Sequence, residues 1–251
     1  MQRIAVLGAG RMGRQIITAV AERRDCQVSG MWSRDAATVA GIAGYTDLSR
    51  LLADSDIAID FTLATATSEV LRAVVAAKVP LVCGVSGLTT EQAIDLDVAA
   101  RSIPLLYDRN MSYGVAVMSR LAEQAAAAFG EGYRVEVHET HHTHKLDAPS
   151  GTALKLGEAL ARGRGRHFDD IYHYEPQPGG AALADDKISF YVRREGEVPG
   201  DHRVEFLAAA ETLTLSHSVT DRRVFADGAL AAARWLATQA PGRYEMTDVL
   251  L

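Results

Sequence analysis

Short apolar runs alternate with amphipathic stretches through the first half of the chain. Five runs have the composition of buried strands, and they cover residues 3–7, 27–32, 57–61, 80–83 and 104–107. Four intervening stretches have apolar residues at helical spacing, and they cover residues 11–24, 48–53, 67–77 and 90–101. This β-α-β-α order predicts a parallel sheet with helices on both faces and right-handed connections.

The pattern changes after Asn110. Helical spacing predicts a long Ala-rich helix over 113–129 and further helices over 152–161 and 227–239. Alternating apolar residues predict strands over 133–138, 188–194, 202–209 and 211–218. The stretch 162–186 is rich in Arg, Gly, Pro and Asp, so we expect a long exposed loop there. The second part is therefore an α+β domain, and we expect its open sheet to be mostly antiparallel.

Composition narrows the functional class. With 48% hydrophobic and 23% charged residues, the 251-residue chain is typical of a globular protein. A net charge of −6 argues against binding nucleic acid or an anionic membrane through bulk charge. No apolar run is long enough to span a bilayer. Cys26 and Cys83 lie in apolar runs without a CxxC pattern, and the first strand starts at once, so we expect a cytoplasmic protein without a leader.

A glycine-rich turn joins the first strand to the first helix. Gly8, Gly10 and Gly13 form a G-x-G-x-x-G pattern that also contains Arg11 and Met12. In this position the glycines allow a tight turn, close approach of a pyrophosphate to the backbone, and close packing of the helix on the strand. The alternative is a turn with a structural role alone. The context favours a Rossmann-like doubly wound, dinucleotide-binding domain.

The end of the second strand bears on which dinucleotide is bound. An acidic residue there would hold the ribose 2′-hydroxyl of NADH, and a basic residue would accept the 2′-phosphate of NADPH. The chain has Ser33 and Arg34 at this point, and Asp35 comes late. NADPH is therefore favoured over NADH, although Arg34 could also simply point into solvent.

Four of the eight histidines fall within seven residues. His138, His141, His142 and His144 precede Lys145 in this segment. Three interpretations compete: a metal site, a solvated polar loop, and a cationic site that binds an anion and donates a proton. No HExxH motif is present and no local carboxylate completes a ligand set, so we predict no metal.

The residues that follow favour the anion site. Ser150, Gly151 and Thr152 open a helix, where a hydroxyl can cap the first turn and exposed amides can bind an anion. Together with the Lys145 ammonium they would hold a carboxylate. A histidine close by can donate a proton at neutral pH.

These segments resemble those of one family. The run E-T-H-H-T-H-K-L-D-A-P-S-G-T-A over Glu139–Ala153 closely resembles the signature of dihydrodipicolinate reductases of lysine and diaminopimelate biosynthesis. Further similar segments occur in the family's order along essentially the whole chain. They are GRMGR at 10–14, DFT at 60–62, GVSG at 84–87 where the family usually has GTTG, N-x-S-x-G-V at 110–115, and R-x-x-F-A-x-G at 222–228.

The resemblance implies reduction of 4-hydroxy-tetrahydrodipicolinate, a small cyclic dicarboxylate, to tetrahydrodipicolinate with NADPH or NADH. His141 would be the general acid and Lys145 would support it. His142, Ser150, Gly151 and Thr152 would bind the substrate. The cofactor would contact Gly8, Gly10, Arg11, Met12, Gly13, Ser33, Arg34, Phe61, Thr62, Gly84, Val85, Ser86, Asn110, Met111 and Ser112. The family also implies a homotetramer assembled through the sheet of the second domain.

We expect two domains, the first of them formed by two separate stretches of the chain. Residues 1–111 and 219–251 form the dinucleotide-binding domain, and residues 112–218 form the domain for substrate binding and tetramerisation. Two departures from the family pattern stand out: the glycine turn is one residue shorter, and Val85-Ser86 replaces Thr-Thr.

Three other functions stay open. The first is an amino-acid dehydrogenase, for aspartate or a diamino acid, with the same dinucleotide domain; the Glu139–Ala153 signature argues against it. The second is a nucleotide-sensing regulator without activity, which the presence of His141 and Lys145 disfavours. The third is a metal-binding protein that uses the histidine cluster.

Overall fold

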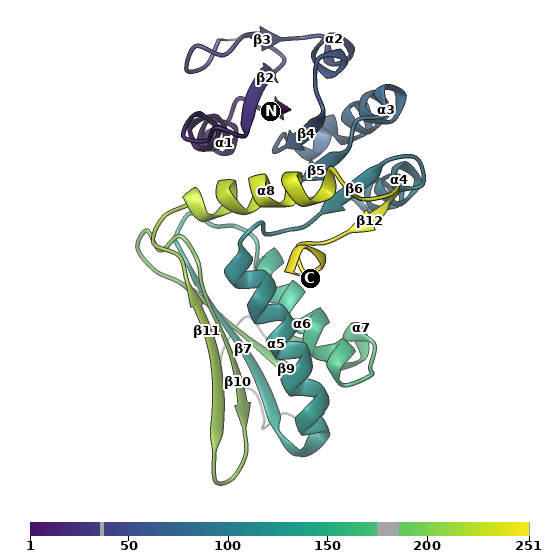
Figure 1. The fold of residues 1–251 in the computed structure, drawn as a ribbon. Coiled ribbons are helices and arrows are strands. Elements are labelled where there is room, and N and C mark those ends of the chain that lie inside the picture. Colours follow the sequence, from purple (N-terminus) through teal and green to yellow (C-terminus); the bar gives the residue numbers. More distant parts are fainter. Residues whose placement is uncertain (36–37, 175–185, 251) are drawn as a thin grey trace. The chain divides into compact units, whose positions relative to one another are not determined.

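A computed structural model describes residues 1–35, 38–174 and 186–250. Backbone contacts divide the chain into two units (Figure 1). Unit 1 consists of Met1–Tyr113 together with Arg223–Leu251, and unit 2 consists of Gly114–Arg222. The chain thus leaves the first unit, builds the second, and returns to complete the first. Among the described residues, none of the helices is long and apolar enough to cross a membrane.

Unit 1 contains a seven-stranded sheet of order β12-β6-β5-β4-β1-β2-β3, and every neighbouring pair is parallel. Its strands are β1 (Gln2–Leu7), β2 (Cys26–Trp32), β3 (Gly44–Tyr45), β4 (Ile57–Asp60), β5 (Leu81–Cys83), β6 (Pro104–Tyr107) and β12 (Gly242–Tyr244). The doubly wound Rossmann-like prediction is confirmed. The short strands β3 and β12 were not predicted, because their sequences, Gly-Tyr and Gly-Arg-Tyr, lack the continuous apolar run that marks the equally short β5.

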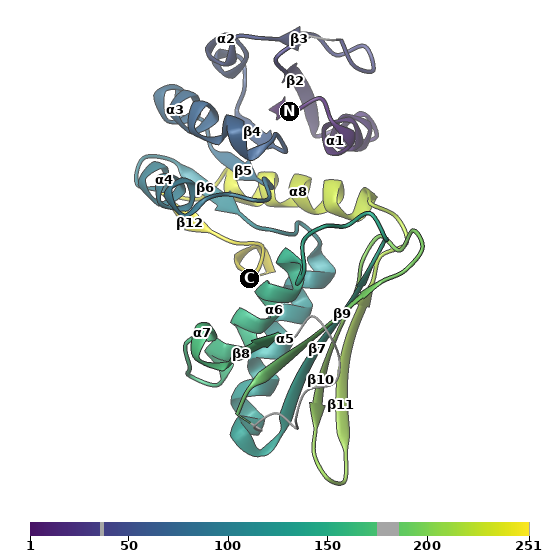
Figure 2. The ribbon, with the colours of Figure 1, turned by 180° about the vertical axis from the view of Figure 1, so that it is seen from behind.

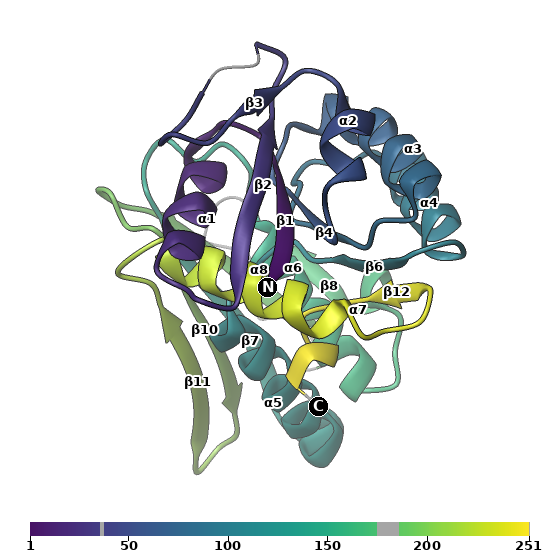
Figure 3. The ribbon, with the colours of Figure 1, turned by 45° about the horizontal axis from the view of Figure 1, so that its top comes forward.

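Helices cover both faces of this sheet (Figure 3). One face carries α1 (Arg11–Ala21) and α8 (Arg223–Leu236), and the other carries α2 (Leu48–Ala53), α3 (Thr67–Ala77) and α4 (Thr90–Ala100). Side chains cap two of these helices: Asp47 accepts from the amides of the first turn of α2, and Thr89 forms a capping box with Gln92 at α4. The central strands are buried on both faces, which explains their continuous apolar runs.

Unit 2 contains a five-stranded sheet of order β11-β10-β7-β9-β8. Its elements are α5 (Tyr113–Phe129), β7 (Arg134–His141), α6 (Gly151–Gly163), α7 (Phe168–Ile171), β8 (Tyr172–Tyr174), β9 (Ile188–Arg194), β10 (Asp201–Leu207) and β11 (Thr212–Ser218). Short 3-10 turns complete the chain at Ala64–Ala66, Gly130–Gly132 and Asp248–Leu250. Helices α5 and α6 lie on the same face of the sheet in both views (Figures 1 and 2).

The direction of the strands in this sheet corrects one expectation. Strand β10 is antiparallel to β7 and β11, but β9 is parallel to both β7 and β8. The sheet is therefore mixed rather than mostly antiparallel. The physical reason is that the chain crosses through α6 and α7 between β7 and β8, so β8 runs in the same direction as β7, and β9 pairs in parallel with both. Part of the expected loop over 162–186 is ordered as the end of α6, α7 and β8, and residues 175–185 lie outside the described residues.

Candidate active site

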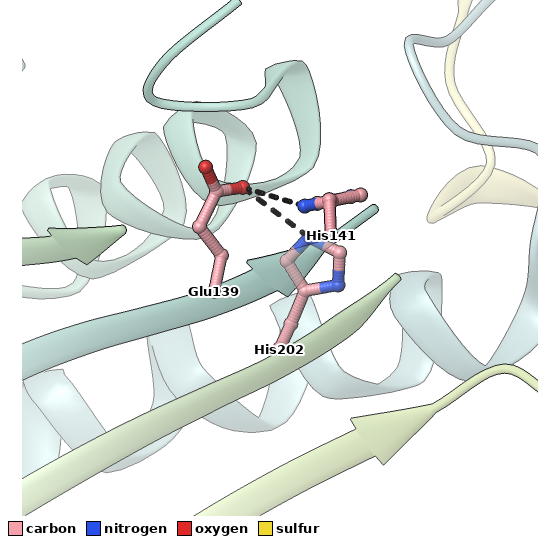
Figure 4. Close-up of side chains that lie close together, drawn as sticks. All are labelled: Glu139, His141 and His202. Carbon is pink, nitrogen blue, oxygen red and sulfur yellow. Dashed lines mark ion pairs between the residues drawn. The ribbon is translucent and has the colours of Figure 1, made fainter. Parts of the chain in front are cut away.

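The buried face of β7 changes character along the strand. Val135 and Val137 pack in the apolar core of unit 2 against residues of α6, and the next two inward residues are Glu139 and His141. The strand extends beyond residue 138, where we expected it to end, so these two residues belong to a strand and not to a loop. On β10, His202 lies directly opposite Glu139 in the antiparallel pairing. The three side chains therefore converge at the polar end of the buried face (Figure 4).

The Glu139 carboxylate is the centre of this group. Its Oε2 atom lies 3.3 Å from Nδ1 of His141 and 3.9 Å from Nε2 of His202. Its Oε1 atom accepts hydrogen bonds from the backbone amide of Ser150 at 3.0 Å and from Nη2 of Arg194 at 3.2 Å. Glu139, His141 and His202 are 2%, 7% and 4% exposed, so their interactions are only weakly screened by solvent.

Their ionisation follows from these surroundings. Burial alone would raise the pKa of Glu139, but His141 and the hydrogen bonds from Ser150 outweigh it and lower that pKa to about 2. Burial lowers the pKa of His202 to about 3, and the nearby His141 acts in the same direction. At neutral pH the group therefore contains an ionised carboxylate and a neutral His202 imidazole.

The start of α6 lies beside this carboxylate. Ser150 is the N-cap of the helix, and its Oγ accepts from the amide of Ala153 at 3.2 Å. The same Oγ lies 3.3 Å from Nε2 of His202. Gly151 follows as the first helical residue, where the amides at a helix start favour an anion. Ser150 is thus joined to His141 through Glu139 and His202, and Gly151 and the buried Thr152 follow it in the helix.

Arg194 connects the Lys145 loop to the same carboxylate. Besides Glu139, its guanidinium donates to the carbonyl oxygens of Lys145 at 3.3 Å and Asp147 at 2.5 Å. The Lys145 ammonium lies 2.8 Å from the Asp147 carboxylate. Neither Arg194 nor Glu139 nor His202 was identified from the sequence. The signal was the alternation of inward residues on β7 and β10, continued through the polar end of each strand.

The four clustered histidines have different surroundings. His138 lies on the opposite side of β7, 3.0 Å from Glu136 and 3.3 Å from Glu205, with its ring stacked on Tyr191. His144 is exposed, 3.6 Å from Glu197.

His142 lies just beyond β7. Its amide donates to the carbonyl of Val198 at 2.8 Å, and burial together with the charge of Arg222 lowers its pKa. His138 and His141 lie on opposite faces of β7, whereas the rings of His142 and His144 lie beyond the strand with their centroids 6.2 Å apart. Of the four, His141 is the one that joins the buried group.

The structure places carboxylates beside two of the clustered histidines, which the sequence did not suggest and which bears on the metal interpretation. Ligand atoms of Glu139, His141 and His202 lie within 4.8 Å of one another, as do those of Glu136, His138 and Glu205 on the other face. In both groups the carboxylates already face histidine or arginine side chains. That the site works without a metal stays a prediction.

In the glycine turn of unit 1, the packing of the chain requires glycine at two positions, Gly8 and Gly13, but not at Gly10. Gly8 has a φ of +107°, and a Cβ there would lie 2.8 Å from the carbonyl oxygen of Phe61. A Cβ at Gly13 would lie 1.9 Å from the carbonyl oxygen of Gly8. At Gly10, by contrast, a Cβ would meet no atom within 4 Å. Open space at the start of α1 is what a bound pyrophosphate needs.

A groove beside this turn has the residues for a dinucleotide. It is lined by Gly8, Ala9, Gly10, Trp32, Ser33, Arg34, Phe61, Thr62, Leu63, Thr65 and Ala66. The Ser33 hydroxyl is buried without a hydrogen-bond partner, and Nη2 of Arg34 lies 3.5 Å from Oγ1 of Thr65. An unsatisfied hydroxyl beside a guanidinium fits a phosphate group.

The other predicted cofactor residues lie outside the lining of this groove. Arg11 is exposed and Met12 half-buried at the start of α1. A Cβ at Gly84 would lie 2.5 Å from the Phe61 ring, so this glycine makes room for Phe61. Val85 packs in the apolar core, which leaves its backbone for a ligand, and Ser86 is exposed.

Residues 110–112 form a compact turn. The Asn110 side chain accepts from the amide of Ser112 at 2.8 Å, and Met111 is buried. A Cβ at Gly228 would lie 1.7 Å from the Met111 carbonyl oxygen, so this turn is held against α8 within unit 1.

Comparison with known proteins identifies the family. The model of the dihydrodipicolinate reductase N-terminus matches residues 2–111, and that of the C-terminus matches residues 114–250. The 4-hydroxy-tetrahydrodipicolinate reductase of Zymomonas mobilis is 41% identical over 249 residues, covering 99% of this chain and 96% of the relative.

Two solved structures share the fold. Dipicolinate-bound dihydrodipicolinate reductase from Paenisporosarcina sp. TG-14 has a TM-score of 0.78 at 22% identity, covering all of both chains. An engineered D-amino acid dehydrogenase bound to NADP+ has a TM-score of 0.59 at 15% identity, covering 98% of this chain and 93% of the other. The full-length family matches favour the reductase over the amino-acid dehydrogenase. The chain therefore belongs to the dihydrodipicolinate reductase family and is an oxidoreductase that reduces 4-hydroxy-tetrahydrodipicolinate.

Proposed function

We propose that His141 is the general acid of this reduction, with the substrate held at the start of α6 and the nicotinamide cofactor held at the glycine turn. The observation that carries the proposal is the buried contact between Nδ1 of His141 and the Glu139 carboxylate, beside the helix start. The carboxylate orients the imidazole ring beside the helix start, where a histidine can serve as a general acid.

The groove at the glycine turn supports NADPH as the preferred cofactor over NADH. The open space at Gly10 accommodates a pyrophosphate, and Ser33 with Arg34 offers a hydroxyl and a guanidinium to a 2′-phosphate. The bound cofactor supplies the hydride. The protein's contribution is to fix the cofactor's orientation through the turn and the groove that Phe61 helps to line.

A small cyclic dicarboxylate suits the other site. The first-turn amide of Gly151, the hydroxyl of Thr152 and the Lys145 ammonium would bind one carboxylate. His142 would contact the substrate from the loop. The fold neighbour that was solved with dipicolinate, a cyclic dicarboxylate, agrees with this substrate class. After hydride addition to the ring, His141 would donate its proton to the carbon that gains electron density.

A coupled assay tests the reaction and the cofactor preference together. The substrate is generated from pyruvate and aspartate semialdehyde by the preceding synthase, and loss of NADPH or NADH absorbance is followed. We expect oxidation of either cofactor to depend on the synthase, with the higher kcat/KM for NADPH. A folded chain that binds the cofactor without oxidising it on this substrate would contradict the proposal.

Arg34→Ala tests the phosphate contact. We expect it to lower kcat/KM for NADPH about tenfold, or roughly 1.4 kcal/mol, while kcat/KM for NADH changes less than about twofold. Arg24→Ala, an exposed arginine of the same unit, is the matched control. Equal losses with both cofactors would show that Arg34 does not contact the 2′-phosphate.

Two expectations of the family complete the proposal. We propose a homotetramer assembled through the sheet of unit 2, which light scattering would measure. We also propose a cytoplasmic location, in keeping with two cysteines that are free and buried.

A further inference from the structure

We propose that Glu139 is a positioning residue that keeps a proton on Nδ1 of His141, so that the proton given to the substrate leaves from Nε2, and that holds the substrate-binding helix start and the Lys145 loop in place. The kinetic part of this inference rests on the proposed function. The structural part concerns the arrangement of hydrogen bonds in the free protein and can be tested without substrate.

The Glu139 carboxylate contacts residues from several elements of unit 2. Oε2 faces His141 of β7 and His202 of β10. Oε1 takes the amide of Ser150 at the start of α6 and the guanidinium of Arg194 at the end of β9. Arg194 in turn holds the carbonyl of Lys145. A carboxylate with four such neighbours fixes the relative positions of the groups proposed to bind substrate and to donate the proton.

The two ring nitrogens of His141 have different surroundings. Nδ1 of His141 and Oε2 of Glu139 lie 3.3 Å apart, and both are buried without a hydrogen-bond partner among the described residues. Since each is the neighbour that can satisfy the other, we infer that Nδ1 keeps a proton in the neutral ring as well as in the charged one. The proton that can leave is then the one on Nε2.

The backbone of Gly200 lies close to this second nitrogen, and a Cβ there would be 3.1 Å from Nε2. The absence of a side chain at Gly200 keeps Nε2 unobstructed. Its φ of +154° is also one that residues with a side chain rarely adopt, so this position favours glycine.

His202 lies between His141 and the cap of α6. Its ring lies edge-on to that of His141, with centroids 5.1 Å apart, and Nε2 is 3.3 Å from the Ser150 hydroxyl. Because this ring is neutral, it does not compete with His141 for the negative charge of Glu139. His202 thus fills the space between Glu139 and the helix cap, and the charge of the carboxylate stays available to His141.

The test compares Glu139→Gln with Glu136→Gln, which removes a carboxylate from the outer side of the same strand. The glutamine of Glu139→Gln would retain an oxygen for the Ser150 amide and would lose the charge. Long-range 1H–15N NMR spectra of the free protein, followed with rising pH until the shifts of the His141 ring stop changing, report which nitrogen of the neutral ring is protonated. We expect Nδ1–H in the wild type and in Glu136→Gln, and a mixture or Nε2–H in Glu139→Gln.

Kinetics provide the second measurement. We expect Glu139→Gln to lower kcat at least about tenfold with KM for the substrate within about threefold, and Glu136→Gln to leave both unchanged. Glu139→Asp, which keeps the charge, should keep the Nδ1–H tautomer and recover part of kcat; it also serves if Glu139→Gln does not fold.

Specific outcomes would overturn the inference. An unchanged tautomer in Glu139→Gln would do so, as would a kcat within about twofold of wild type. One equivalent of bound zinc that is lost in Glu139→Gln would also overturn it, because a metal would then occupy the place of the Nδ1 proton. If the wild type failed to reduce the substrate, the proposed function would fail, while the tautomer of His141 would still decide this inference.

Discussion

At the scale of single residues, Asp60 is a buried carboxyl whose charge the fold disfavours. It ends β4 and is 1% exposed. Oδ1 accepts from the Thr62 amide at 2.8 Å, but Oδ2 has no hydrogen-bond partner. Burial raises the pKa of Asp60 to about 6 from an ordinary value of 3.8. The folded chain therefore binds this proton more tightly than the unfolded chain. Its stabilising contribution is full below pH 3.8 and is lost as the pH rises through 6.

Asp60→Asn tests this linkage. The amide keeps an acceptor for Thr62 and cannot ionise, so we expect the variant to be more stable than the wild type at pH 8, by about 1–3 kcal/mol. The difference should shrink as the pH falls toward 4. Urea unfolding at pH 4.5, 6 and 8 measures it, and the exposed Asp95→Asn is the control. A difference that is independent of pH would contradict the assigned ionisation.

The sequence identified the residues at this scale unevenly. The types and spacing of Lys145 and Ser150 suggested anion binding, and the resemblance to the reductase family suggested His141 as the acid. Glu139 and His202 were not found, because each belongs to the site only through strand pairing. Sixty-three positions separate Glu139 from His202, and no local pattern indicates that they are opposite each other.

At the scale of elements, the glycine turn separates a steric requirement from a functional one. Gly13→Ala would place a Cβ against the Gly8 carbonyl, so we expect a destabilised protein. Gly10→Ala meets open space at a φ that alanine adopts, so we expect stability within about 0.5 kcal/mol of wild type. Its Kd for NADPH should nevertheless rise at least about tenfold, because the Cβ takes the place of the pyrophosphate.

Thermal unfolding and fluorescence titration with NADPH measure these two effects. The opposite pattern, with Gly10→Ala binding NADPH as the wild type does, would show that the cofactor does not approach the backbone at this residue.

Long elements were predictable because their patterns repeat several times. The bounds of α3 and α5 agree with the predicted ranges, as do those of β6 and β9. The strands β3, β8 and β12 have two or three residues each and, unlike the equally short β5, contain no continuous apolar run. The mixed second sheet was missed for a different reason: strand direction depends on the crossover through α6, and strand composition does not encode it.

At the scale of the whole molecule, the last 29 residues, Arg223–Leu251, complete the first unit. Within that unit, Arg23 pairs with Asp227 of α8 at 3.0 Å, and the Asp108 carboxylate accepts from the amide of Met246 at 3.1 Å. The tight contact of Gly228 with the Met111 carbonyl belongs to the same interface. The first unit is therefore not a continuous stretch of sequence.

Removal of residues 223–251 should abolish NADPH binding. The truncation deletes α8, whose buried residues include Ala229, Ala233 and Leu236. The apolar sheet face on which α8 packs would then be exposed to water. Gly228→Ala should weaken the same interface in a chain of full length. We expect a lower Tm and, at low temperature where the variant is folded, a Kd for NADPH close to that of the wild type. Circular dichroism and fluorescence titration provide the measurements. Unchanged NADPH affinity in the truncated chain would contradict this division of the molecule.

The central claim is that His141 donates the proton, and His141→Gln tests it most directly. Glutamine keeps a polar side chain but cannot serve as an acid at neutral pH, so we predict that kcat falls about 10²- to 10⁴-fold. Dipicolinate affinity measured by calorimetry should stay within about threefold of wild type, because the helix start and Lys145 are untouched. His144→Gln, the exposed histidine of the same segment, should leave both quantities unchanged. Turnover of His141→Gln within about twofold of wild type, or a large loss of dipicolinate binding with kcat retained, would contradict the account.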